Sequence, residues 1–264
     1  MEPVAPGELF PFGATLNPSE GNRAAEKTGP AGSFGARRDK FVARYADPEW
    51  PQAAPPRAIY MQAKAREVYV PPVLQDLRAG TAELHIALEK RLPFFSDTLD
   101  TPAFERLMQA YYGFYLPVEQ ALQASNAIPD DFDLTPRLKT ATLRADLQAL
   151  SATDDSLGNL PLCAELPRID SSAACLGVLY VLEGATLGGQ ILRREIAARL
   201  GLEADNGAAF LDVYGAATGR RWRDFIEYLG SRPMDAAERA AVVRAAQTTF
   251  SCFEQWLERR EVLA

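Results

Sequence analysis

One long apolar stretch constrains the fold of this chain more than any other feature of its sequence. Residues 175–200 read CLGVLYVLEGATLGGQILRREIAARL, with apolar residues at the spacing of a helix, and Gly201 follows as a helix stop. We therefore expect one helix from about Ser172 to Leu200. A helix with so little polar surface has to be covered on most sides, so it predicts the centre of a multi-helix core.

Other stretches of helical spacing flank this one, and none alternates apolar and polar residues as a strand would. Thr101-Pro102 and Thr135-Pro136 each have the form of a helix start, with Thr as N-cap and Pro in the first turn. The predicted fold is an all-α, multi-helix bundle over residues 68–264. The further helices that we expect cover residues 74–92, 101–122, 135–150, 205–229 and 235–260.

Residues 1–67 differ from the rest of the chain. They hold nine prolines and six glycines and show no sustained apolar period. Such a composition is typical of a disordered or irregular extension, in which FVARYADPEW and AIYMQAKAREVYV are candidates for short ordered patches. We expect this N-terminal arm to be a tail without a role of its own.

Charge and cysteine usage bound the possible partners. The net charge of −7 argues against a nucleic-acid-binding protein, which needs a basic surface to neutralise phosphates. Cys163, Cys175 and Cys252 have no metal-binding or redox spacing, and we expect them to be core thiols in a reducing cytosol. Glu183 and the three glycines at 184, 188 and 189 keep the apolar stretch short of a clean membrane span. We expect a cytoplasmic protein that binds neither nucleic acid nor membrane.

The chain contains a single histidine, His85, at the border of the apolar face of the first predicted helix. Glu89 lies one helical turn later on the same face. This is the arrangement of a metal-ligating imidazole whose second ring nitrogen donates to a carboxylate. One histidine excludes a zinc site of His and Cys spacing and a di-iron carboxylate bundle. Two interpretations remain: haem iron held by one axial ligand, or a hydrogen-bonded or solvated histidine without a ligand.

Three glycines lie close together in the middle of the central helix, although each costs about 1 kcal/mol relative to alanine in a helix interior. Gly184 and Gly188 are four residues apart and share one side of the helix, with Gly189 beside them. The missing side chains allow either a flat ligand or a neighbouring helix to approach the backbone, and they favour a kink. Glu183, about 100° round the helix from Gly184, is expected to be structural, buried and paired.

Together, GTAELHIALE around His85 and LYVLEGATLGGQIL around the glycines resemble the haem oxygenase family, most closely its bacterial biliverdin-producing members, which are associated with bacteriophytochromes or with haem-iron utilisation. The resemblance covers residues 72–260 and leaves the N-terminal arm unmatched. It implies opening of haem b, both cofactor and substrate, to biliverdin, CO and Fe2+ with O2 as co-substrate. It also implies an external electron donor, either ferredoxin or an NAD(P)H-dependent reductase, and names a biliverdin-accepting phytochrome as a candidate partner.

The resemblance assigns roles to individual residues. His85 matches the axial ligand of the haem iron, and Glu89 matches the carboxylate one turn later. Gly184 and Gly188, with Gly189 beside them, match catalytic glycines that let the distal helix bend over the iron. Arg78 matches a basic residue that meets a haem propionate in related enzymes. Phe250 matches an aromatic residue of the last helix that lines the pocket.

The sequence departs from the family pattern after the first of these glycines. Mammalian members carry an aspartate there that orders the proton-delivering water, whereas this chain has Ala185. Arg220, Arg221 and Arg223 do not align cleanly with further propionate partners, and an ordinary solvated helix face accounts for them. These departures keep open two alternatives: a haem-binding carrier or sensor that does not degrade its ligand, and a helical interaction module without haem.

Overall fold

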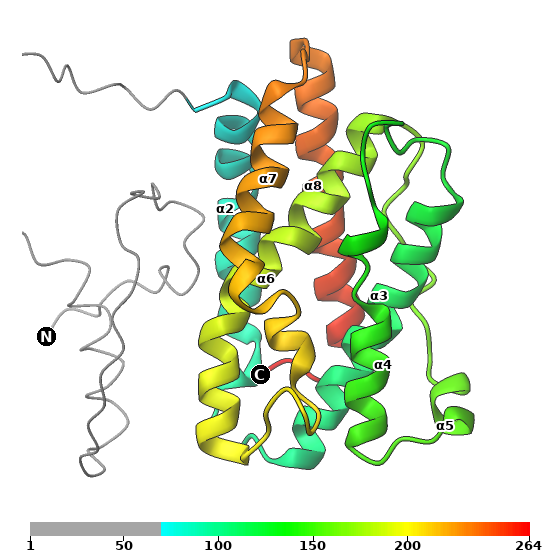
Figure 1. Cartoon of the computed structure of the whole chain (residues 1–264), viewed down its shortest axis with the longest axis vertical. Helices are drawn as coiled ribbons and strands as arrows, with labels where there is room; N and C mark the ends of the chain where they lie inside the picture. The colour runs from blue at the N-terminus through cyan, green and yellow to red at the C-terminus, as the bar shows by residue number, and fades with distance from the viewer. Residues whose placement is uncertain (1–69) are drawn as a thin grey trace, which may run out of the picture. The chain divides into compact units, whose positions relative to one another are not determined.

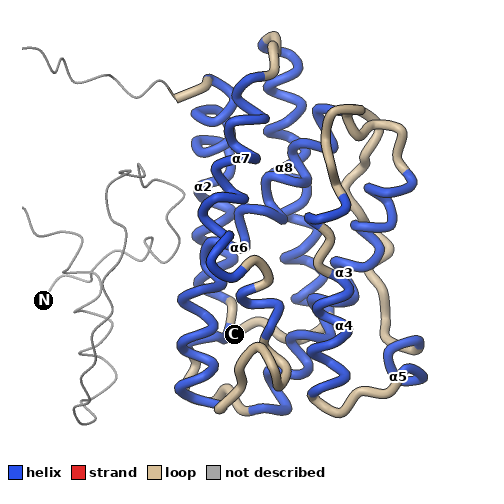
Figure 2. The backbone as a smooth tube through the Cα atoms, in the orientation of Figure 1, coloured by secondary structure: helices blue, strands red, loops and turns tan. Residues whose placement is uncertain are grey.

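The computed structural model describes residues 70–264, so the prediction of an irregular arm over residues 1–67 lies outside the described residues. Residues 70–264 form seven α-helices, joined by loops and short 3₁₀ helices, and contain no strand (Figures 1 and 2). The predicted all-α fold is therefore confirmed for this part of the chain. The helices are α2 (Pro72–Arg91), α3 (Thr101–Ala124), α4 (Thr140–Ala149), α5 (Asp154–Gly158), α6 (Ser172–Leu200), α7 (Thr218–Ser231) and α8 (Ala236–Arg259).

Helix α6 is the central element of the bundle, as its apolar sequence predicts. It packs along α8 and against α7, while α2 packs along α8 and α3 packs against α4. Figure 1 shows α6 running obliquely from the α3 side of the bundle to the α2 side. Cys175, Leu179 and Tyr180 of α6 are all 1% exposed or less, so this helix supplies much of the core.

The bounds of α6 agree with the prediction at both ends. The Ser171 side chain accepts a hydrogen bond from the Ala174 N–H as N-cap, and Gly201 ends the helix with a left-handed φ of 69°. Helices α2 and α8 also lie within two residues of their predicted bounds. By length and composition α6 alone among the described helices could cross a membrane, and 72% of its most apolar segment is buried inside the bundle. A core helix shows the same combination.

The predicted start of α3 needs a small correction. Its N-cap is Asp100, whose carboxylate accepts a hydrogen bond from the Ala103 N–H at 2.8 Å, and Thr101 is already helical. Aspartate caps a helix as well as threonine does. Pro102 then occupies the second helical position, where its missing N–H is still without cost.

The predicted start of α4 at Thr135 is wrong. Thr135-Pro136 opens only a 3₁₀ turn that ends at Arg137, and the α-helix begins at Thr140. Its N-terminus is capped by Glu119 of α3, which accepts hydrogen bonds from the Lys139 and Thr140 N–H groups at 2.6 and 3.1 Å. A cap supplied by another helix leaves no local sequence signal for the start of α4.

The helix predicted over residues 205–229 begins 13 residues late, because 3₁₀ turns replace its first half. Gly207 and Gly215 have φ values of 117° and 52°, left-handed conformations that a continuous α-helix does not contain. The two 3₁₀ helices are η3 (Ala209–Asp212) and η4 (Gly215–Ala217).

Helix η3 is held firmly between α4 and α6. The buried Asp146 carboxylate of α4 accepts hydrogen bonds from the Ala209 and Phe210 N–H groups at 2.9 and 2.7 Å. On the other side, a Cβ added at Gly189 would lie 1.9 Å from the Leu211 carbonyl oxygen. Close backbone packing therefore accounts for one of the three glycines in the middle of the central helix.

Candidate functional site

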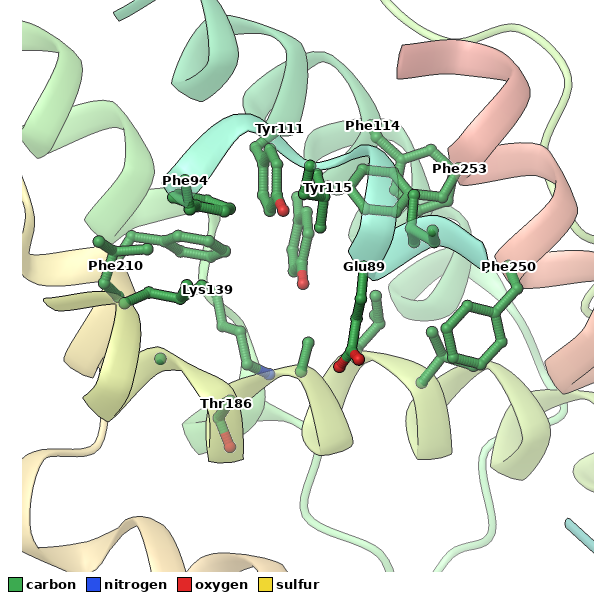
Figure 3. Close-up of a pocket in the computed structure, with 18 of the residues that line it drawn as sticks. Glu89, Phe94, Tyr111, Phe114, Tyr115, Lys139, Thr186, Phe210, Phe250 and Phe253 are labelled. Carbon is green, nitrogen blue, oxygen red and sulfur yellow. The ribbon is translucent and has the colours of Figure 1, made fainter. Parts of the chain in front are cut away.

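A partly open pocket lies among α2, α3, α6, α8 and η3, with about 890 Å³ of empty space that includes open solvent (Figure 3). Its walls are mostly aliphatic and aromatic, which is usual for a small-molecule site. Polar side chains reach it at few points. They are His85, Glu89, Tyr111, Tyr115, Lys139 and Thr186.

His85 and Glu89 share the α2 wall of the pocket. His85 Nε2 lies 3.2 Å from Glu89 Oε1, and the two side chains are 18% and 9% exposed. Burial lowers the pKa of His85 to about 4 and raises the pKa of Glu89 to about 8. The imidazole is therefore neutral at pH 7, which is the form that binds a metal. Glu89 Oε1 is buried, and its 3.2 Å contact with His85 Nε2 lacks the geometry of a hydrogen bond, so among residues 70–264 this oxygen is left for a ligand or water to meet.

Phe250 of α8 lies on the pocket wall next to His85. Its ring meets the imidazole edge to face, with ring centroids 5.8 Å apart. The aromatic wall continues through Tyr111, whose ring centroid lies 5.0 Å from that of Phe253 and 5.7 Å from that of Phe210. These rings present a continuous apolar surface to a flat ligand.

Helix α6 forms the facing wall, along the lower part of Figure 3. Ala185 and Gly189 lie on this wall, so little side chain projects from it into the pocket there. Gly184 and Gly188 are buried on the neighbouring side of the helix and are not among the lining residues. Direct contact of these two glycines with a ligand stays a prediction from the sequence.

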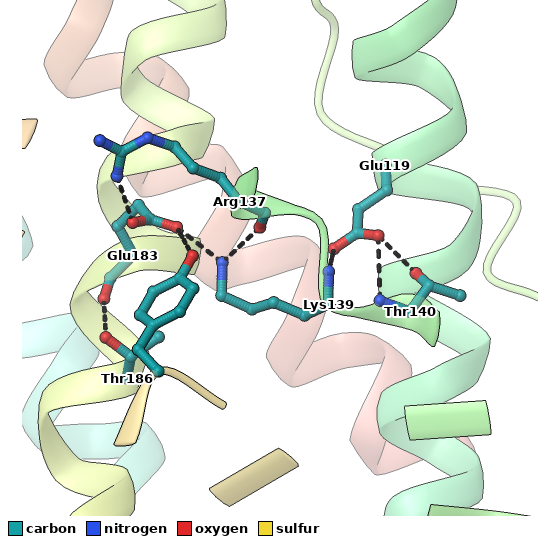
Figure 4. Close-up of polar contacts among 7 residues, drawn as sticks. Glu119, Arg137, Lys139, Thr140, Glu183 and Thr186 are labelled. Atoms are coloured by element: carbon teal, nitrogen blue, oxygen red, sulfur yellow. Dashed lines mark hydrogen bonds and ion pairs between the residues drawn. The ribbon is translucent and has the colours of Figure 1, made fainter. Parts of the chain in front are cut away.

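A buried ion cluster adjoins the α6 wall (Figure 4). Glu183 Oε2 accepts a hydrogen bond from Arg137 Nη1 at 2.5 Å, and Oε1 accepts from Lys139 Nζ at 2.6 Å and Tyr214 Oη at 2.8 Å. Glu183 and Lys139 are each 1% exposed. The expectation that Glu183 is buried and paired is confirmed. Its partners are 31 to 46 residues away in the sequence, so no spacing rule could have identified them.

The predicted basic residues lie away from the pocket walls. Arg78 is half-buried on α2, two turns before His85, and is not a lining residue. The Arg221 guanidinium lies over the Tyr214 ring, 5.1 Å from its centroid. Arg220 and Arg223 are exposed, as expected for a solvated helix face.

The cysteines have the environment of core thiols. Cys175 is fully buried, and burial raises its pKa to about 11. Burial also raises the pKa values of Cys163 and Cys252. A nucleophilic cysteine needs the opposite shift, since the thiolate is the reactive form.

The geometry suits one flat, mainly apolar ligand with a metal at its centre. Within residues 70–264, no group of three or more His, Cys, Asp or Glu side chains could hold a bare metal ion. One neutral imidazole can supply a single axial ligand to a metal whose other ligands come from a macrocycle. The apolar walls and the buried oxygen of Glu89 beside the imidazole fit such a group. Fold and site therefore define a helical haem-binding protein.

Comparison with known proteins gives the family. The model of the heme oxygenase family matches residues 72–259, and the chain belongs to the haem oxygenase family. A heme oxygenase of Xanthomonas campestris pv. campestris (strain 8004) is 32% identical over 124 residues, which are 46% of this chain and 68% of that protein. Heme oxygenase PigA of Pseudomonas aeruginosa is 28% identical over 190 residues, 70% of this chain and 91% of that protein.

Solved structures share the fold. Heme oxygenase from Leptospira interrogans superposes with a TM-score of 0.59 at 20% identity, covering 71% of this chain and 98% of that one. Heme oxygenase-1 from Synechocystis sp. PCC6803, solved in complex with heme, gives 0.59 at 16% identity over 71% and 91% of the two chains. Through its family, the protein is a haem-binding oxidoreductase that converts haem to biliverdin.

Proposed function

We propose that the pocket binds haem with His85 as the axial ligand of the iron, and that O2 and externally supplied electrons open the ring to biliverdin, CO and Fe2+. One observation carries the proposal: the single histidine of the chain is neutral and lies beside Glu89 on the wall of an apolar pocket. Haem supplies the iron at which O2 is activated. The residues of this chain bind it, orient it and keep water away.

The α2 and α8 walls hold and orient the imidazole. Burial keeps His85 unprotonated at neutral pH, so a metal does not have to displace a proton from it. Glu89, one turn later, limits the orientations of the ring, as carboxylates beside metal-binding histidines do. Phe250 restricts it from the α8 side.

The α6 wall, opposite α2, would leave room for a small ligand beside a bound haem. Ala185 and Gly189 bring little or no side chain into the pocket. Gly184 and Gly188 loosen the middle of α6, which supports haem entry and product release by movement of this helix. Arg78 lies on the same helix as His85 and is our proposed partner for a haem propionate.

The setting of the reaction follows the resemblance to bacterial family members. The electron donor is a ferredoxin or an NAD(P)H-dependent reductase in the cytoplasm, and a phytochrome is a candidate acceptor of biliverdin. The catalytic domain covers residues 68–264, and residues 1–67 are an extension to it. The composition of this extension supports the division.

The assignment of His85 is tested by haem titration followed by turnover with ascorbate or ferredoxin. His85→Ala is expected to lose the Soret shift of ligated haem and to form no biliverdin, because the chain holds no second imidazole. Glu83→Gln, an exposed change on the same helix, is the control and is expected to behave as the wild type. Biliverdin formation at the wild-type rate in His85→Ala, without added imidazole, would refute the assignment.

A further inference from the structure

We propose that Lys139 is the hydrogen-bond donor that the pocket presents to a small neutral ligand on its α6 side. Glu183 is the positioning residue that holds the Lys139 ammonium in place. The inference rests on the proposed function, because it concerns a diatomic ligand such as O2 in the haem-loaded pocket.

Lys139 has a donor left over. Its side chain is 1% exposed and lines the pocket. The ammonium donates to Glu183 Oε1 at 2.6 Å and to the Arg137 carbonyl oxygen at 2.8 Å. A lysine has three N–H donors, and no oxygen of residues 70–264 accepts the third one; the Tyr214 ring centroid lies 5.3 Å from the nitrogen. Figure 3 shows the nitrogen next to the ribbon of α6. Because Lys139 lines the pocket, we take its third N–H to be within reach of a molecule bound there.

The α6 wall itself supplies no competing donor. Ala185 has none, and the Thr186 hydroxyl already donates to the Glu183 carbonyl oxygen at 2.7 Å. Tyr111 and Tyr115 also reach the pocket, but from α3, and their hydroxyls are neutral because burial raises their pKa values. A hydrogen bond from a charged donor is about twice as strong as one from a neutral donor. Lys139 is therefore the strongest candidate donor among the lining residues.

Several charged groups surround Lys139 before any ligand binds. Arg137 and Lys139 pair with Glu183, and Arg221 is a further positive group, over the Tyr214 ring at 5.1 Å. Glu119 approaches from the backbone side, accepting a hydrogen bond from the Lys139 N–H at 2.6 Å. Two of the three Lys139 N–H groups are already bonded, so the ammonium has one hydrogen bond left to offer, fewer than a carboxylate can accept. A diatomic ligand such as O2 needs only one.

The ammonium is also rigidly placed. Glu183, its main acceptor, is held from two further directions by Arg137 and by Tyr214. The Arg137 guanidinium in turn lies over the rings of Phe132 and Phe225, 5.1 and 5.5 Å from their centroids. A donor fixed in this way loses little freedom when a ligand accepts its hydrogen bond.

The test measures O2 and CO dissociation from the reduced, haem-loaded, full-length protein by flash photolysis, without an electron donor. A charged hydrogen bond of about 1.5–3 kcal/mol corresponds to a roughly 10- to 150-fold faster O2 dissociation in Lys139→Met. CO is the weaker acceptor, so its dissociation rate is expected to change far less. Its stretching frequency is expected to rise when the donor is removed.

Two further variants separate this role from a structural one. Thr140→Val removes the hydroxyl that donates to Glu119 Oε2 at 2.6 Å in the same segment, leaves the Lys139 ammonium in place and is expected to keep wild-type ligand rates. Glu183→Gln loosens the ammonium and is expected to raise the O2 rate selectively, by less than Lys139→Met does. This variant also carries the test if Lys139→Met fails to fold.

Two results would overturn the proposal: an unchanged O2 rate in folded, haem-loaded Lys139→Met, or an equal rise of both ligand rates. An equal rise would point to displaced haem and hence to a propionate contact or a packing role. Failure of the wild-type protein to give a haem Soret band would instead count against the proposed function, so the two failures are distinguishable.

Discussion

Replacement of Glu89 by glutamine is expected to remove a pH dependence from the stability of the haem-free protein. Burial raises the folded-state pKa of Glu89 from 4.5 to about 8. The protonated carboxyl of Glu89 therefore stabilises the folded protein fully below pH 4.5, and this contribution is lost as the pH rises to about 8. His85 has the opposite sign, because its folded-state pKa falls from 6.5 to about 4 and its neutral form is favoured above pH 6.5.

The magnitude follows from these two windows. Each unbalanced proton changes the free energy of unfolding by about 1.4 kcal/mol per pH unit. Between pH 4.5 and 6.5 the contributions of His85 and Glu89 cancel. Between pH 6.5 and about 8 only Glu89 contributes, so over these 1.5 pH units its ionisation lowers the stability by about 2 kcal/mol. Glutamine keeps the shape of the protonated side chain and cannot ionise.

Urea denaturation of the haem-free protein at pH 6.5, 7, 7.5 and 8 checks this value. The free energy of unfolding of Glu89→Gln is expected to gain about 2 kcal/mol relative to the wild type across this series. Glu83→Gln removes an exposed carboxylate from the same helix and is expected to follow the wild type. Parallel curves for the wild type and Glu89→Gln would mean that the Glu89 carboxyl is already ionised in the folded protein, and the argument from burial would fail.

Two further predictions concern the packing of η3 against the pocket. Gly189→Ala is expected to lower the free energy of unfolding in urea by about 1–3 kcal/mol, because its Cβ would meet the rigid Leu211 carbonyl. The control is Gly219→Ala, whose Cβ would have no atom within 4 Å and which is expected to be neutral or slightly stabilising. Equal stabilities of these two variants would show that η3 yields easily. Asp146→Ala leaves two backbone N–H groups of η3 without their acceptor and is expected to lower the free energy of unfolding by about 2–4 kcal/mol. Amide exchange in η3 is expected to be faster in this variant than in Asp205→Ala, a control at an exposed position. Unchanged exchange in η3 would mean that α6 packing alone holds this segment.

Features that depend on neighbouring residues could be predicted from the sequence. The bounds of α6 follow from an apolar period, a serine N-cap and a glycine that accepts a left-handed φ, all of which act within a few residues. The pairing of His85 with Glu89 is equally local, because one helical turn places the two side chains together whatever surrounds them. Two sequence motifs, one around His85 and one around the glycines of α6, were sufficient to indicate the family.

Features that join distant parts of the chain could not be predicted in this way. The start of α4 depends on Glu119, about 20 residues earlier on another helix, so a local Thr-Pro signal indicated the wrong residue. A left-handed φ at Gly207 and at Gly215 interrupts the helix predicted over residues 205–229, although the sequence there permits a helix.

The sequence by itself determined an all-α fold around one apolar helix and a histidine–glutamate pair on another. Only the tertiary structure decided that Gly189 serves the packing of η3 and that Lys139, 54 residues from His85 in the sequence, lines the same pocket. The physical reason is the range of the interactions. Helical period and capping act within a few residues, whereas close backbone contacts and buried ion pairs depend on which helices meet after the chain has folded.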